Sequence, residues 1–238
     1  MSEPPFWFLN IAFLPTILLM PRPALLFRRR FIWMSALIAT EYINLDNIAT
    51  VPKEAIIYTL KPRLKAGTQL SIYQLLFPLL MESSNEAAET IARYYGRANF
   101  IKHMNEKAVS IGMLRSHFAD PSGASAENTS TAEDLFMLAK YIYNNRSFIF
   151  NITSGKVEES AYGKSDFTDL ANLNDFIDNE FFFGGKNGKT AAAAETNLSV
   201  FEFPVGPIKR PIVSIVLDSP NEKNDTETLI DYTLNNFR

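Results

Sequence analysis

The sequence contains no cysteine and only two histidines, and these absences exclude several kinds of site. Without cysteine the chain can form no disulfide, no thiolate metal site and no cysteine nucleophile. The two histidines, His103 and His117, are 14 residues apart, so we expect no histidine-rich metal site. A Ser-His-Asp triad would have to use one of them. We therefore expect neither a metal nor an organic cofactor.

An excess of positive charge is also absent. The 238 residues include 23 lysines and arginines against 26 aspartates and glutamates, for a net charge of −3. A nucleic-acid-binding face needs a basic excess, so we expect no nucleic-acid partner. The chain is 47% hydrophobic, which is enough for one good core or two small ones.

Long hydrophobic runs are scarce except near the N-terminus. The segment Phe6–Met20 is apolar apart from Asn10 and Pro15, and it is followed by the basic run Arg28–Arg30. A membrane-spanning helix needs about 20 apolar residues, and a signal peptide carries its positive charge before the apolar run. We therefore treat residues 1–33 as an atypical segment. It is either a membrane anchor or degenerate export signal, or it has no clear structural role.

Hydrophobic residues recur at helical spacing through the middle of the chain. The predicted helices cover residues 34–43, 70–96 with an interruption at 83–85, 99–112 and 129–145. We expect Asn85 to cap the helix that follows the interruption, and Gly96 to end it. We expect the last of these helices to begin with a capping box formed by Ser130 and Glu133.

The last third of the chain has the pattern of strands. Runs of β-branched and aromatic residues cover 181–188, 196–205 and 210–219. The last two are separated by Gly206 and Pro207, which predicts an antiparallel hairpin. A final helix is predicted over 224–237.

The segment Gly184–Thr190 reads GGKNGKT, one residue short of a phosphate-binding loop. A phosphate loop must open a helix, but only about five residues separate Thr190 from the next predicted strand. We therefore favour a second interpretation, in which Lys186 lies on a strand. Gly188 would then let a ligand lie close to that strand.

The combination of motifs is more specific than any one of them. Ser83-x-Asn85 and Lys186-Asn187-Gly188 resemble two of the three motifs of penicillin-interacting serine enzymes. Over about residues 35–237 the chain resembles the serine D-alanyl-D-alanine carboxypeptidases, the low-mass penicillin-binding proteins. The resemblance is carried by LLFPLLMESSNEAAETIA, SIGMLRSHFADPSG, TAEDLFMLAKYI, NLN at 172–174 and FFFGGKNGKT.

This resemblance implies the fold and the domain organisation. The fold would be α/β (α+β), of the β-lactamase/transpeptidase-like kind, with an antiparallel sheet flanked by helices and a separate helical lobe. Residues 34–238 would form the carboxypeptidase-like domain, incomplete at its N-terminus. The family acts on peptidoglycan stem peptides and binds β-lactams. It works outside the cytoplasm, in the periplasm or on the outer face of the membrane, which the N-terminal segment supports only weakly.

The resemblance also implies roles for individual residues. Ser83 would help to transfer a proton to the leaving amine, and Asn85 would orient the substrate. Lys186 would supply positive charge. The substrate-binding residues would be Asn187, which replaces the family's threonine, together with Gly188 and Thr190.

The family's first motif, Ser-x-x-Lys, is missing from the entire sequence. Alignment of WMSALIATEY with the family pattern puts Arg29 at the nucleophile and Ile32 at the lysine. Neither can replace the residue that it aligns with, so we predict that this chain forms no acyl-enzyme. Residues 1–33 are either foreign to the family, as after a frame shift or gene truncation, or they belong to a catalytically inactive relative. The function that the resemblance implies is that of a serine-type D-Ala-D-Ala carboxypeptidase of stem peptides, inactive in this chain because Ser-x-x-Lys is missing. The alternative function is that of a non-catalytic relative that binds peptidoglycan peptides.

The other conspicuous residues are predicted to be structural. We expect His117 to lie in a structural turn and His103 on a helix surface. We expect Asp120, which precedes Pro121 and Ser122, to accept hydrogen bonds in a turn. The aromatic runs 141–143 and 181–183 are expected in the core.

Overall fold

The computed structural model describes residues 11–13, 16–18, 32–56, 62–157, 164–190, 193–205 and 207–236. Its helices are α1 (Ile32–Tyr42), α2 (Lys53–Ile56), α3 (Ile72–Glu82), α4 (Asn85–Tyr95), α5 (Arg97–Ser110), α6 (Ala132–Asn145), α7 (Phe148–Ser154) and α8 (Glu222–Asn236). Its strands are β1 (Ile11–Phe13), β2 (Thr16–Leu18), β3 (Ile48–Thr50), β4 (Gln69–Ser71), β5 (Phe182–Thr190), β6 (Ala193–Val205) and β7 (Ile208–Ser219). This arrangement confirms the predicted fold class.

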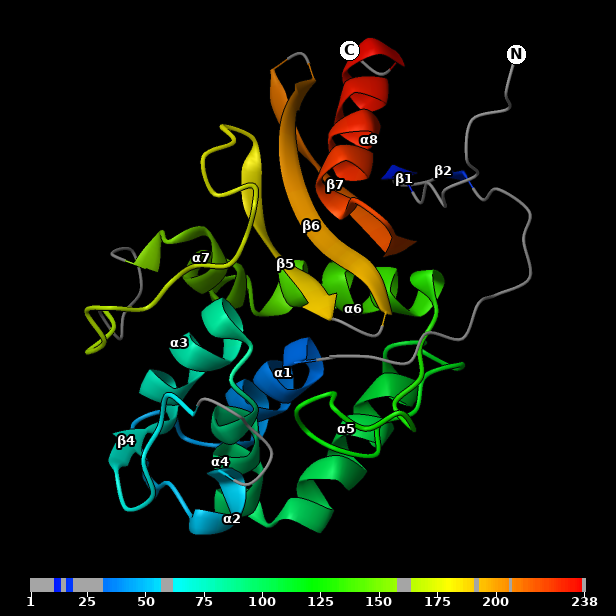
Figure 1. Ribbon diagram of the computed structural model, residues 1–238. Coiled ribbons are helices and arrows are strands. Elements are labelled where there is room, and N and C mark those ends of the chain that lie inside the picture. Colours follow the sequence, from blue (N-terminus) through cyan, green and yellow to red (C-terminus); the bar gives the residue numbers. More distant parts are fainter. Residues whose placement is uncertain are drawn as a thin grey trace.

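A helical lobe surrounds α1 (Figure 1). The residues from Ile32 to Ala39 are all buried, and α1 packs against α3, α4, α5 and α6. A helix that is apolar on all sides is stable only when neighbours cover all of it. The predicted helix over 34–43 is thus confirmed, and the structure places it at the centre of the lobe.

A three-stranded antiparallel sheet, in the order β5-β6-β7, forms the second lobe. The register pairs Val205 with Ile208, which confirms the predicted hairpin between the last two strands. Helix α8 covers one face of the sheet, and α6 and α7 contact β7 and β5 between the sheet and the helical lobe (Figure 1). A small aromatic core fills the α8 side, with Phe182, Phe201 and Ile230 among its buried residues.

Helix α7 and the short elements before α3 are not predicted by the sequence pattern. The segment FIFNITS is rich in aromatic and β-branched residues, which favour strands, yet it forms α7. Phe150 of α7 is fully buried and packs against Trp33 and Phe183, with ring centroids 5.0 and 5.8 Å away. Tertiary packing therefore decides the conformation here. The connection before α3 also contains the three short elements β3, α2 and β4.

Two predicted helix caps are wrong by one residue. Asn85 does not cap α4; Ser84 does, in an extended conformation, with its Oγ accepting from the Ala87 amide at 3.1 Å. Ser83 ends α3 in a left-handed conformation, so the cap of the next helix falls at residue 84, one residue earlier than predicted. Gly96 ends α4 as predicted.

The second incorrect cap lies at α6. Its cap is Thr131, whose Oγ1 accepts from the Asp134 amide at 3.2 Å. Ser130 and Glu133 do not form the predicted capping box. The Ser130 hydroxyl instead lies 2.7 Å from that of Ser116. Because the Ser130 hydroxyl is engaged with Ser116, the next residue, Thr131, caps the helix.

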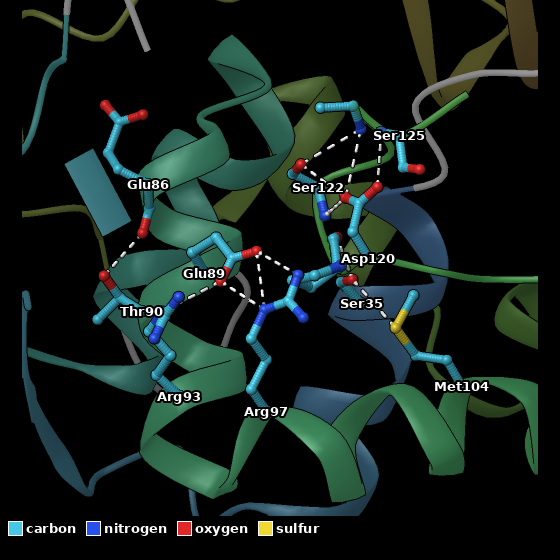
Figure 2. A network of polar contacts seen from close by, with 12 residues as sticks. Ser35, Glu86, Glu89, Thr90, Arg93, Arg97, Met104, Asp120, Ser122 and Ser125 are labelled. Atoms are coloured by element: carbon cyan, nitrogen blue, oxygen red, sulfur yellow. Dashed lines mark hydrogen bonds and ion pairs between the residues drawn. The ribbon is translucent and has the colours of Figure 1, made fainter. Parts of the chain in front are cut away.

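Asp120 organises the loop between α5 and α6, as predicted for a turn acceptor (Figure 2). Its carboxylate accepts from the amides of Ser122, Gly123 and Ser125 and from the Asn128 side chain, at 2.6 to 2.7 Å. Ser35 of α1 donates to the carbonyl of Pro121 and so ties the same loop to the centre of the lobe.

His117 has a structural role, as predicted, but in an isolated backbone bridge with Thr129 instead of a turn. His103 lies on α5 as predicted, beside Glu106, and stacks on Tyr42 at 4.6 Å. In the aromatic runs Phe182 and Ile142 are buried, and their aromatic neighbours pack against the core.

Before α1, the N-terminal segment contributes a short antiparallel pair, β1 with β2, to the described residues. The remainder of the apolar run and Arg28–Arg30 lie outside the described residues. Within the described part of the chain, no helix has the length and apolar character needed to cross a bilayer.

Candidate active site

The first half of the candidate site is the turn between α3 and α4. Ser83 has φ 57° and ψ 40°, and it is one of two non-glycine residues with positive φ in the described part of the chain. The amides of Ser83 and Ser84 both donate to the carbonyl of Pro78. This conformation costs about 1–2 kcal/mol for a residue with a Cβ. Ser83 is therefore held in an unfavourable conformation at the position where the motif expects a reactive-site hydroxyl.

The second half is strand β5, on which Lys186, Asn187, Gly188 and Thr190 follow one another. The structure confirms that Lys186 lies on a strand and excludes the phosphate-loop interpretation, because β5 is followed by β6 instead of a helix. The side chain of Thr190 lies outside the described residues.

Lys186 shares a face of β5 with Gly184, since alternate residues of a strand point the same way. A Cβ on Gly184 would lie 2.6 Å from the Cβ of Phe150, so this face lies directly on α7. Lys186 is 9% exposed, and its ammonium donates to the Asn187 carbonyl at 2.8 Å. The side chain is thus largely buried on the face of the sheet that meets the helical lobe, where water screens its charge poorly.

Asn187 points to the opposite face of β5. Its amide nitrogen donates to Asp175 at 2.9 Å and to Glu222 of α8 at 3.2 Å. A ligand carboxylate that used this donor would therefore have to displace one of two carboxylates of the chain itself.

A loop comprising residues 169–175, here called the bridging loop, contacts both halves of the site. The Leu173 amide donates to the Met81 carbonyl at 3.3 Å, close to Ser83. The Asn172 side chain donates to the Thr153 carbonyl at 2.7 Å, and the Thr153 hydroxyl accepts from the Gly185 amide at 3.1 Å. Two residues of one loop thus connect the end of α3 to the residue before Lys186.

These elements, in this order, match a known family. A sequence profile described as D-alanyl-D-alanine carboxypeptidase matches residues 34–220. The chain belongs to this family. The family assignment confirms the resemblance on which the site residues were selected.

Curated relatives agree with the assignment. Over 140 residues the chain is 34% identical to a D-alanyl-D-alanine endopeptidase of Haemophilus influenzae, covering 58% of this chain and 47% of the relative. Over 139 residues it is 33% identical to a D-alanyl-D-alanine carboxypeptidase of Mycobacterium tuberculosis, covering 56% of this chain and 46% of the relative. The chain therefore spans less than half the length of these relatives.

Solved structures share the fold. A penicillin-binding protein homologue from Mycobacterium tuberculosis superimposes with a TM-score of 0.79 at 23% identity, covering 97% of this chain and 90% of that one. Penicillin-binding protein D2 from Listeria monocytogenes, in its cefotaxime-bound form, gives a TM-score of 0.72 at 22% identity, with 96% of each chain covered.

The residue that we align with the family's lysine, Ile32, falls at the start of α1. Ile32 is its first residue and is 1% exposed, so the position carries an apolar side chain packed in the core. Arg29, aligned with the nucleophile, lies outside the described residues. Nothing at position 32 can accept a proton.

The residues that support the site are not apparent from the sequence. The motif NLN at 172–174 indicates the bridging loop but not its contacts. Arg63, which binds Glu82 and Asp169, lies 19 residues before Glu82 in the chain and belongs to none of the family motifs. No local pattern could have identified it.

Proposed function

We propose that this domain recognises the D-Ala-D-Ala end of peptidoglycan stem peptides without hydrolysing them. The observation that supports the proposal is the bridging loop, which joins the Ser83 turn to the strand that carries Lys186. In this arrangement the Ser83 hydroxyl and the Asn85 amide belong to one wall of a site, and the Lys186 ammonium belongs to the other.

The roles proposed for these groups follow from their chemistry. A buried ammonium attracts the C-terminal carboxylate of a peptide more strongly than an exposed one does. In the described sheet β5 pairs with β6 alone. An extended peptide that adds to its outer edge would replace the contacts that the Gly185 amide makes with Thr153 and the Asn187 carbonyl makes with Lys186. In this proposal Gly188 lets the peptide lie close to the strand, while Ser83 and Asn85 supply hydrogen-bond donors. Hydrolysis would further need a nucleophile and a base, and the positions aligned with them are Arg29 and Ile32.

We extend the proposal to β-lactams as non-covalent ligands, because these compounds mimic the same peptide end. The stem peptide lies outside the cytoplasmic membrane, so we also place the domain there. A role of the N-terminal segment in export or membrane attachment is part of this proposal.

Replacing Lys186 by alanine is expected to weaken binding of a peptide that ends in D-Ala-D-Ala by tenfold to a hundredfold. A hydrogen bond to a charged group contributes about 1.5–3 kcal/mol, and 1.4 kcal/mol corresponds to about tenfold in affinity. Isothermal titration of both proteins measures the difference. Lys209→Ala, which removes an exposed lysine of β7, is the control and should bind like the unchanged chain. Equal affinity of Lys186→Ala and the unchanged chain would show that Lys186 does not contribute to peptide binding.

A further inference from the structure

Arg63 makes polar contacts on both sides of the Ser83 turn. Its guanidinium donates from Nε and Nη2 to the two carboxylate oxygens of Glu82, the last residue of α3. Its backbone amide donates at 2.7 Å to Glu86, in the first turn of α4. The segment around Arg63 therefore holds the helix end before Ser83 and the helix start after it.

The same guanidinium also binds the bridging loop. Nη1 donates to the carboxylate of Asp169 at 2.9 Å, and Nη2 contacts the Asp169 carbonyl at 3.3 Å. Glu82 in turn accepts from the Ala171 amide at 3.0 Å. Arg63 and Glu82 together fix the beginning of the loop to the end of α3.

The end of the bridging loop reaches β5. Asp175 accepts from Asn187, the residue after Lys186, and Asn172 is linked through Thr153 to Gly185, the residue before it. A displacement of the loop at Asp169 would therefore be transmitted to both neighbours of Lys186.

The pair with Glu82 is the stronger of the two carboxylate contacts. The Arg63 and Glu82 side chains are 22% and 16% exposed, whereas Asp169 is 76% exposed. A bidentate pair fixes geometry as well as energy, and an exposed ion pair contributes little. Hydrogen bonding to Glu82 raises the pKa of Arg63 above its ordinary value, even though burial lowers it. The guanidinium thus stays charged.

We propose that Arg63 is a positioning residue that sets the place of the Ser83 turn relative to Lys186 through Glu82 and the bridging loop. The functional meaning of this placement rests on the proposed peptide site, whereas the placement itself can be tested without any ligand.

Hydrogen exchange of the Arg63→Ala variant tests the placement directly. Four amides report on it: Ser84, bonded to Pro78; Ala171 and Leu173, bonded to the end of α3; and Gly185, bonded to Thr153. We expect each to exchange about tenfold faster, while amides inside α6 keep their rates. Arg63→Lys keeps the positive charge but cannot contact both oxygens of Glu82 as the guanidinium does, so it should give an intermediate increase in the exchange rates. Arg146→Ala removes another partly exposed arginine, which lies 4.0 Å from Glu41, and should change none of the four.

Two results would overturn the proposal. An increase at Ser84 and Ala171 without one at Gly185 would show that the loop does not couple the turn to β5. A uniform increase along the whole chain, in both Arg63→Ala and Arg63→Lys, would show that Arg63 contributes only to global stability.

Peptide titration of the same variants separates this proposal from the proposed function. If the site binds peptide, Arg63→Ala should weaken binding about tenfold and Arg146→Ala should not. If the unchanged chain binds no peptide, the proposed function fails, and the exchange rates still decide whether Arg63 positions the turn.

Discussion

A fluorescent penicillin is expected to leave no covalent label on this chain after denaturation. Acylation needs a hydroxyl that attacks the lactam carbonyl and a base that takes its proton. The family supplies both from Ser-x-x-Lys, and here the aligned residues are Arg29 and Ile32. An arginine stays protonated, and isoleucine has no ionisable group. Ile32 is also 1% exposed and belongs to the hydrophobic core.

The label is best measured by gel fluorescence, with a family member that retains Ser-x-x-Lys treated in parallel. That control must be labelled, whereas the present chain should show only the background of a denatured sample. A label on this chain that survives denaturation and maps to one serine would contradict the account. Ser83 would then be the first residue to examine.

Replacing Asp120 by alanine is expected to destabilise the protein by about 3–5 kcal/mol. Asp120 is 7% exposed, and its carboxylate accepts from several amides and from the Ser122 hydroxyl, which would lose their partner together. Each hydrogen bond to a charged group contributes about 1.5–3 kcal/mol, and buried donors left unpaired add a desolvation cost. Denaturant unfolding measures the change. Glu127→Ala, an exposed carboxylate of the same loop, should cost less than about 0.5 kcal/mol; a similar loss in both variants would contradict this assignment.

The same contacts predict a dependence on pH. Burial alone raises the pKa of Asp120, but hydrogen bonds from Ser122, Ser125 and Asn128 outweigh it and lower the pKa below its ordinary value of 3.8. A carboxyl group with a lowered pKa stabilises the folded state above its unfolded pKa, and this contribution is lost as the pH falls through the folded value. The unchanged protein should therefore lose stability below about pH 4 more steeply than Asp120→Asn, which has no carboxyl group to protonate.

The order of elements and the motif residues could be predicted from the sequence because each is a local pattern. Helices α4, α5 and α6, the hairpin of β6 and β7, and the position of Lys186 on a strand all follow from periodicity or short signatures. The two predicted helix caps were one residue wrong because adjacent polar residues can each serve as the N-cap. Ser83 takes the left-handed conformation and Ser84 then caps the helix, although Asn85 is as good a cap by type.

The supporting contacts could not be predicted because they join residues far apart in the chain. Arg63 and Asp169 are 106 residues apart, and Thr153 and Gly185 are 32 apart. The helical conformation of α7 depends on Phe150 packing against Trp33 and Gly184, so its own residues favour the wrong structure. Even the orientation of Asn187 toward Glu222 requires the position of α8.

Cross-linking of an engineered cysteine pair tests most directly whether Ser83 and Lys186 face one site. The natural chain has no cysteine, so Ser83→Cys with Lys186→Cys introduces the only thiols. The account predicts that a short bis-maleimide joins the two within one molecule, and that Ser83→Cys with Lys209→Cys stays unlinked. If the second pair, with its exposed position on β7, is linked as readily as the first, the turn and the strand do not form a common site.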